Sequence, residues 1–64
     1  MERPVRRMLR LNGERVSVTL EPIFWSLLRD SGPDTLEVVD AQRGDVSLSS
    51  ALRTWLTAEL VGQL

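Results

Sequence analysis

The chain has no cysteine and no histidine among its 64 residues. Without cysteine there can be no disulfide bond, and without either residue type there is no tetrahedral Cys/His metal site. Histidine is also the usual group for proton transfer near neutral pH, and cysteine is a common nucleophile. The serines have no evident base, and no Gly-rich phosphate loop is present. We therefore expect no enzyme, no metal and no cofactor.

Lysine and long apolar runs are missing too. No apolar stretch approaches the ~18 residues of a membrane-spanning helix, and no charged-then-apolar signal peptide opens the chain. These features predict a soluble, cytoplasmic protein that does not enter a membrane. All 8 basic residues are arginine, which suits bidentate contacts to phosphate or guanine. A genomic bias towards GC-rich codons would give the same composition.

The short chain limits the size of the core. A domain of about 60 residues buries only about 60% of its unfolded surface, and it usually needs disulfides, a metal or oligomerisation. Disulfides are excluded here, and a metal would find no Cys or His ligands. Oligomerisation remains, and the 42% of residues that are hydrophobic supply surface for it. We therefore expect a single domain, residues 1–64, that forms an obligate homodimer.

The net charge of −1 conceals an uneven distribution. Residues 1–15 contain five arginines and two acidic residues, whereas residues 16–64 contain three arginines and seven acidic residues. The chain therefore has a basic head and an acidic body. The acidic residues do not match the spacing of an EF-hand loop, and we interpret them as helix caps and solvated faces.

The basic head runs into the segment RLNGERVSVTL, residues 10–20. Asn12-Gly13 is the strongest short-range signal for a two-residue type I′ turn, which needs positive φ at both positions. It predicts strands at about 5–11 and 14–20, with residues 1–4 disordered. Whether the first strand stays in the sheet or forms an arm along DNA is open.

A two-residue turn also fixes which side chains share a face of the hairpin. Cross-strand partners then have residue numbers that add up to 25, so Arg7 faces Val18 on the apolar face. The opposite face is polar and basic and consists of Arg6, Met8, Arg10, Arg15, Ser17 and Thr19. Its apolar counterpart needs a cover, which either a dimer mate or a helix would supply.

A helix is expected directly after the second strand. Pro22 suits a first helical turn, where its missing N–H costs nothing. The spacing of Phe24, Leu27 and Leu28 then indicates an apolar stripe and predicts a helix at about 22–31.

Two further helices follow. Asp34 and Glu37 have the spacing of a capping box, which predicts a short helix at about 35–42. Ser47 is expected to cap a last helix at about 48–62. The apolar stripe of that helix consists of Leu48, Leu52, Trp55, Leu56 and Leu60.

The polar face of the hairpin fits DNA recognition. The major groove of B-DNA admits a two-stranded ribbon, and Arg, Ser and Thr can hydrogen bond to base edges there. Antiparallel pairing with the same strand of a second subunit would match a palindromic site. We expect base contacts from Arg15, Ser17 and Thr19. Phosphate contacts, which are independent of sequence, are expected from Arg6, Arg7 and Arg10.

One pair on this face needs an explanation. Arg10 lies directly opposite Arg15, and like charges in that position destabilise a sheet. Either an external anion binds between the two side chains, or both turn into solvent at a small cost.

Four blocks of sequence, taken together, resemble a known family: Arg10–Gly13, Ser17–Pro22, Phe24-Trp25 and Ser47–Arg53. They resemble ribbon-helix-helix DNA-binding proteins, the class of the Arc and MetJ repressors. A closer resemblance is to small bacterial members with an N-terminal hairpin strand and a third helix, and it covers roughly residues 6–60. The resemblance implies a mostly α fold with a short β-ribbon, and an intertwined dimer.

The resemblance also implies roles for particular residues. Base contacts would again come from Arg15, Ser17 and Thr19. The backbone amides at the start of the second helix, at Asp34 and Thr35, would bind a phosphate. The core of the dimer would include Val16, Val18, Leu20, Phe24 and Leu28.

Two functions follow from these patterns. The first is a dimeric, sequence-specific transcription regulator, such as a repressor, that binds double-stranded DNA at a palindromic site. The alternative is a protein-protein interaction or assembly module that uses the same scaffold without DNA. The second helix, which is shorter than in the family, and the Asp34 carboxylate beside the phosphate favour the alternative. A protein partner would be anchored by Trp25 or Trp55 if either is exposed.

Overall fold

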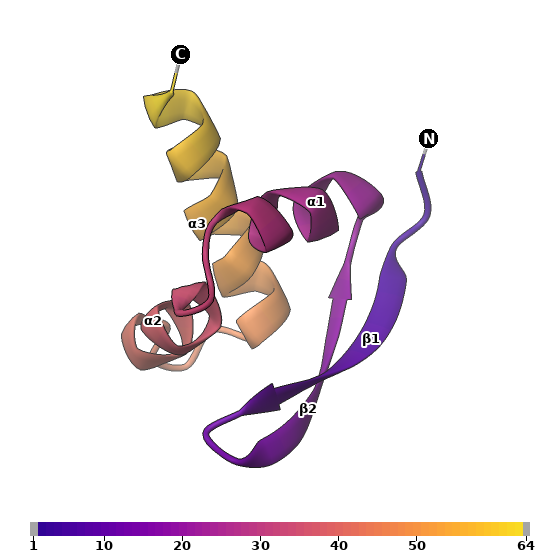
Figure 1. Cartoon of the computed structure of the whole chain (residues 1–64), viewed down its shortest axis with the longest axis vertical. Coiled ribbons are helices and arrows are strands. Elements are labelled where there is room, and N and C mark those ends of the chain that lie inside the picture. Colours follow the sequence, from indigo (N-terminus) through magenta and orange to yellow (C-terminus); the bar gives the residue numbers. More distant parts are fainter. Residues whose placement is uncertain (1, 64) are drawn as a thin grey trace.

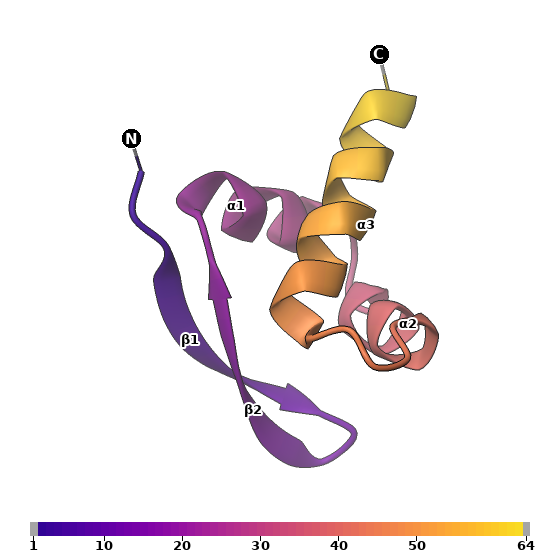
Figure 2. The same ribbon diagram turned by 180° about the vertical axis from the view of Figure 1, so that it is seen from behind.

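A computed structural model describes residues 2–63 of the chain. The order of elements is β1 (Val5–Leu11), β2 (Glu14–Leu20), α1 (Pro22–Asp30), α2 (Thr35–Gln42) and α3 (Leu48–Gly62). The strands form a twisted antiparallel hairpin, and the three helices lie on one side of it (Figure 1). The view from behind shows the turn of the hairpin at the end of the molecule opposite the last turn of α3 (Figure 2). None of the helices within residues 2–63 is long and apolar enough to cross a bilayer.

The hairpin has the predicted register. Arg10 pairs with Arg15 beside the turn, and Val5 pairs with Leu20 at the far end. Asn12 and Gly13 have φ values of 51° and 82°, as a type I′ turn requires. The first strand is therefore part of the sheet and not an arm. Residues 2–4 precede it without regular secondary structure, and the disorder expected at Met1 lies outside the described residues.

A test of the hairpin is Gly13→Ala, because L residues are strained at a φ of +82°. We expect the free energy of unfolding to fall by about 1–2 kcal/mol, the cost of the left-handed conformation for a residue with a Cβ. The control is Gly62→Ala in α3, where φ is not positive and an added Cβ meets no atom within 4 Å. Urea unfolding of both variants would contradict the turn assignment if the two substitutions had the same effect.

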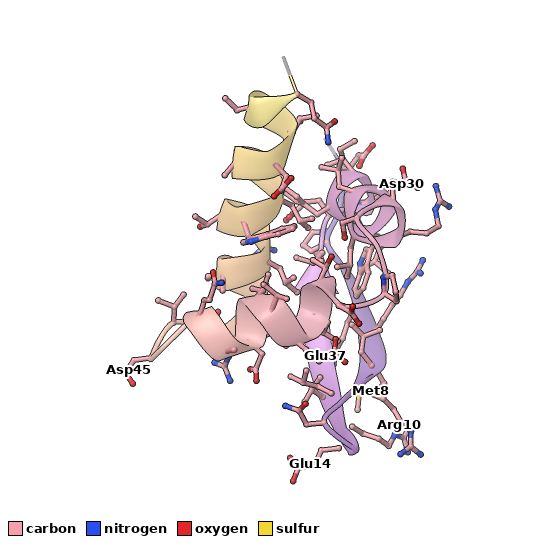
Figure 3. All side chains as sticks on the ribbon, turned by 60° about the vertical axis from the view of Figure 1, so that its left-hand side comes forward. Met8, Arg10, Glu14, Asp30, Glu37 and Asp45 are labelled. Atoms are coloured by element: carbon pink, nitrogen blue, oxygen red, sulfur yellow. The ribbon has the colours of Figure 1, made fainter. Side chains whose placement is uncertain are left out.

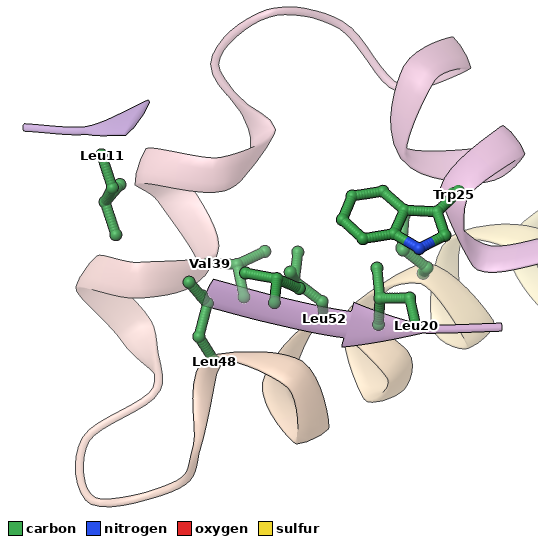
Figure 4. Packing of buried hydrophobic residues seen from close by; sticks show 8 residues of the cluster. Leu11, Leu20, Trp25, Val39, Leu48 and Leu52 are labelled. Atoms are coloured by element: carbon green, nitrogen blue, oxygen red, sulfur yellow. The ribbon is translucent and has the colours of Figure 1, made fainter. Parts of the chain in front are cut away.

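The core lies between β2 and α3. Val18, Leu20, Leu52 and Leu56 are at most 1% exposed. Leu52 is packed in one cluster with Leu20 and with Val39 of α2, and Figure 4 shows these side chains together. The third helix therefore covers the apolar face of β2. The sequence had left open whether a second subunit or a helix would do so.

Two predicted apolar stripes differ from the observed ones. In α1 the buried residue is Trp25, at 9% exposure, whereas Phe24, Leu27 and Leu28 are only half-buried. In α3 the predicted stripe ends early, because Leu60 is 41% exposed. In α1 it is Trp25 that lies against β1, where its indole bonds to the Val5 carbonyl and stacks with Arg7.

The predicted starts of α1 and α3 are confirmed. Pro22 begins α1, and the Ser47 hydroxyl accepts a hydrogen bond from the Ser50 N–H at 3.2 Å. The capping box at α2 is wrong, because Asp34 makes no side-chain capping bond. Asp34 has helical dihedral angles, and the hydroxyls of Thr35 and Ser31 bond to each other instead, at 2.7 Å.

Candidate nucleic-acid interface

The alternation of the two strands places six side chains on one surface of the hairpin, which we call the polar face. They are Arg6, Met8, Arg10, Arg15, Ser17 and Thr19, all exposed except the half-buried Thr19. The Arg6 Nε donates a hydrogen bond to the Ser17 Oγ at 2.6 Å, which shows directly that the two strands share this face. Figure 3 shows Arg10 extending away from the helices near the turn. Five of the predicted DNA-contacting residues are therefore brought together here.

The arginines of the hairpin differ from those of the helical body in their partners. Arg29, Arg43 and Arg53 each form an ion pair with a carboxylate. Within residues 2–63, none of the four hairpin arginines forms an ion pair: Arg6, Arg7, Arg10 and Arg15. A guanidinium group without a carboxylate partner keeps its charge available for phosphate or base edges. The hairpin, with Arg3 just before it, thus carries the arginines of the described chain that have no ion pair.

Arg10 and Arg15 concentrate this charge beside the turn. They are direct cross-strand partners, and both side chains are exposed. Their repulsion weakens the sheet in the free protein, and an anion bound between them would remove that cost. The arrangement therefore favours binding of a polyanion at the turn end of the polar face.

Arg7 lies apart from the other hairpin arginines. It faces Val18 on the opposite side of the sheet, and its guanidinium carbon is 5.1 Å from the centre of the Trp25 ring. The Trp25 Nε1 also donates a hydrogen bond to the Val5 carbonyl at 2.9 Å. Trp25 thus fastens β1 to α1, and the predicted phosphate contact of Arg7 would have to form away from the polar face.

The two tryptophans are not equally accessible. Trp25 is buried, and an anchor for a protein partner would have to be exposed. Trp55 is half-buried and lines an open groove between α2 and α3. Only Trp55 remains a candidate anchor.

Along the outer edge of β2, some backbone groups are hydrogen bonded to α3 and others have no partner within residues 2–63. The Thr19 N–H donates to the Ser49 Oγ at 3.1 Å, and the Thr19 carbonyl accepts from the Arg53 Nη2 at 3.1 Å. Backbone groups of alternate residues in an antiparallel strand point to the same edge, so those of Arg15 and Ser17 also face outward. No group within residues 2–63 bonds to them at that edge.

Arg53 also holds the residue that joins β2 to α1. Its Nε and Nη2 donate to the two carboxylate oxygens of Glu21 at 2.7 and 3.1 Å. These hydrogen bonds lower the pKa of the Glu21 carboxyl below its ordinary value and raise the pKa of Arg53. Glu21 is the N-cap residue of α1 but makes no side-chain capping bond, since its carboxylate is occupied by Arg53.

The start of α2 offers less to a phosphate than was expected. Thr35 as a whole is only 5% exposed, and its hydroxyl donates to the Ser31 carbonyl at 3.2 Å. Its backbone amide is the group left for the predicted phosphate contact. Asp34 is exposed beside it, and its negative charge opposes an anion there.

The residues predicted for the dimer core divide into two groups. Val18 and Leu20 are fully buried within one chain. Val16, Phe24 and Leu28 are half-buried, and they are the members of the set that still have surface to bury. Any dimer would therefore add to a core that each chain has already formed.

Sequence reasoning assigned no role to four residues at or behind the polar face. Met8 is 49% exposed at its centre, opposite Ser17, and an apolar side chain there can contact a thymine methyl group. Glu21, Ser49 and Arg53 support Thr19 from behind. These three residues lie in sequence blocks that support the family resemblance. Nothing in the sequence, however, indicates that side chains 30 or more residues apart are in contact.

The chain was compared with known proteins. The model of one protein family, described as a ribbon-helix-helix domain, matches residues 4–60. No curated protein and no solved structure matches the chain. The matched range begins just before the hairpin and includes all of β1, β2, α1 and α2 with most of α3.

Proposed function

This chain belongs to the ribbon-helix-helix domain family, and on that basis we propose that it is a dimeric, sequence-specific DNA-binding transcription regulator. Members of the family generally bind DNA as transcription regulators, typically dimerise, and are typically not enzymes. The hairpin would enter the major groove of a palindromic site, where base edges present distinct patterns of donors and acceptors. A repressor acts in this way when its site overlaps a promoter.

The observation that supports this proposal most is the unpaired charge of the hairpin. Arg6, Arg10 and Arg15 share the polar face with Ser17 and Thr19, and within residues 2–63 none of the three arginines meets a carboxylate. Arg15 would bind the O6 and N7 of a guanine, and the hydroxyls would bind neighbouring base edges. Arg6 and Arg10 would bind phosphates, as would Arg7 and the Thr35 amide at the margins of the interface.

The dimer would form along the open part of the β2 edge. The outward backbone groups of Arg15 and Ser17 are free to pair with the same strand of a second copy. Such pairing is antiparallel and two-fold symmetric, which matches the symmetry of a palindromic site. The half-buried Val16, Phe24 and Leu28 would then gain cover from the partner.

The test is selection of bound DNA from a random-sequence pool at two salt concentrations, with the oligomeric state measured in the same buffers. We expect enrichment of palindromic sequences and a dimer in solution. With three phosphate-binding arginines in each subunit, Arg6, Arg7 and Arg10, the logarithm of affinity should fall with the logarithm of salt concentration at a slope of about −5. Binding without enrichment of any sequence would overturn specific regulation.

A groove between α2 and α3 favours a second candidate, an interaction module that does not use DNA. The groove has a volume of about 360 Å³ and is lined by Trp55 and Val46, of which Val46 is 50% exposed. It lies in the acidic body of the chain, away from the hairpin. This candidate predicts a dimer that retains no DNA from the pool at either salt concentration, so the same experiment separates the two functions.

A further inference from the structure

The end of β2 is held by side chains of α3 at the residue closest to the helices. Thr19 donates its N–H to Ser49 and accepts a bond at its carbonyl from Arg53, both at 3.1 Å. Arg53 is itself fixed by the two-pronged pair with Glu21. We call these three supporting residues, Glu21, Ser49 and Arg53, the Thr19 clamp.

The clamp satisfies both outward backbone groups of one residue on the polar face. An edge strand of a two-stranded sheet otherwise leaves these groups to water, and the strand can twist and fray. Because both of these groups bond to side chains of α3, the backbone of Thr19 has a fixed position and orientation relative to that helix. The outward backbone groups of Arg15 and Ser17 have no such bonds within residues 2–63.

We propose that Ser49 and Arg53 are positioning residues for DNA reading, which hold the Thr19 side chain at the place where it meets a base edge. The inference rests on the proposed function and names two residues of α3 that touch no base themselves. A hydroxyl hydrogen bond depends steeply on distance and angle, so a small shift of the strand end would remove it. The clamp thus makes α3 a determinant of specificity.

The chain offers closely matched controls. Arg43 forms an ion pair with Asp40 at 2.7 Å and donates to the Val46 carbonyl at 2.8 Å. It is as exposed as Arg53, 33% against 35% of the side chain, but its contacts are far from the hairpin in the sequence. Arg43→Met therefore removes the same type of bond as Arg53→Met without touching β2. Ser50→Ala is the corresponding control for Ser49→Ala.

The first measurement is hydrogen exchange of the Thr19 amide in the free protein, followed by NMR. In Ser49→Ala, which removes the acceptor of the Thr19 N–H, we expect exchange to be about two- to tenfold faster, as for the loss of one hydrogen bond. Arg53→Met removes the bond to the Thr19 carbonyl and both bonds to Glu21, and we expect it to speed exchange of the same amide by loosening the end of the strand. Arg43→Met and Ser50→Ala should leave the Thr19 amide unchanged. Unchanged exchange in both clamp variants would overturn the inference without reference to DNA.

The second measurement is the base preference of each variant in the random pool. Thr19→Ala first identifies the positions that depend on the Thr19 side chain. We expect Ser49→Ala and Arg53→Met to lose preference at those same positions, by about two- to tenfold, and to keep it at the positions lost in Arg15→Ala. A purely structural role would instead lower affinity for all sequences alike.

The outcomes separate the inference from the function on which it rests. If the wild-type protein enriches no sequence, the proposed function fails and the inference with it. If the wild type has a preference and Arg53→Met behaves like Arg43→Met, the inference alone fails. Should Arg53→Met not fold, Ser49→Ala decides the matter, because alanine is favourable inside a helix and the substitution removes one bond.

Discussion

Truncation of Leu52 to alanine is expected to remove most of the stability of the fold. Leu52 is 0% exposed between β2 and the helices, and such a substitution costs about 2–5 kcal/mol through lost burial and the cavity left behind. A core of this size rarely supplies more than about 3–5 kcal/mol. Circular dichroism during urea unfolding should show a large fall in the midpoint, or a chain that is mostly unfolded in buffer.

Leu60→Ala is the matched control for this prediction. It makes the same chemical change on the same helix, but Leu60 is 41% exposed, so its effect should stay within about 0.5 kcal/mol. Similar losses in both variants would contradict the packing of α3 against β2. A large loss in Leu60→Ala alone would mean that the end of α3 is buried in a dimer.

The hairpin and the limits of the helices were readable from local patterns. Asn12-Gly13 specifies a turn whose two residues fix the entire cross-strand register, so the composition of the polar face followed from counting. Pro22 and Ser47 each determine one helix start through their own chemistry. These signals act within a few residues of the chain and need no knowledge of the tertiary fold.

Features that depend on long-range packing were harder to predict. The sequence shows that the apolar face of β2 needs a cover, but both α3 and a second subunit have suitable apolar stripes. In the structure, Leu52 and Leu56 of α3 cover Val18 and Leu20 within one chain. The burial of Trp25 in place of its neighbours likewise depends on where β1 lies, because its indole bonds to the Val5 carbonyl.

The candidate site shows the same division. The alternation of side chains along the strands correctly places Arg6, Arg10 and Arg15 on the polar face. It also places Arg7 on the opposite, apolar face. Charge alone had grouped Arg7 with the phosphate contacts, whereas the structure gives it a position over Trp25. The Thr19 clamp joins residues 30 or more positions apart, and no periodicity in the sequence reports such a contact.

Arg15→Ala is expected to relax the base preference of the protein rather than abolish its affinity for DNA. A bidentate arginine contact to guanine discriminates against other bases by about 1–3 kcal/mol, whereas a phosphate contact weakens all sequences alike and contributes to the salt slope. Arg10 lies directly opposite Arg15 and is equally a free, exposed arginine. Arg10→Ala should therefore lower affinity uniformly and flatten the slope by about 2 for the two subunits.

The comparison of these two facing arginines distinguishes reading from charge attraction. If the hairpin bound DNA only through its charge, Arg10→Ala and Arg15→Ala would be equivalent, since each removes one unpaired cation from the same place. Arg29→Ala controls for charge elsewhere, because its side chain is 77% exposed and lies outside the hairpin. Equal effects of the two hairpin variants, or an undiminished sequence preference in the triple variant Arg15→Ala, Ser17→Ala, Thr19→Ala, would show that the polar face does not read bases. Loss of base preference in Arg15→Ala together with a uniform loss of affinity in Arg10→Ala would assign the base contact to β2 and the phosphate contact to β1.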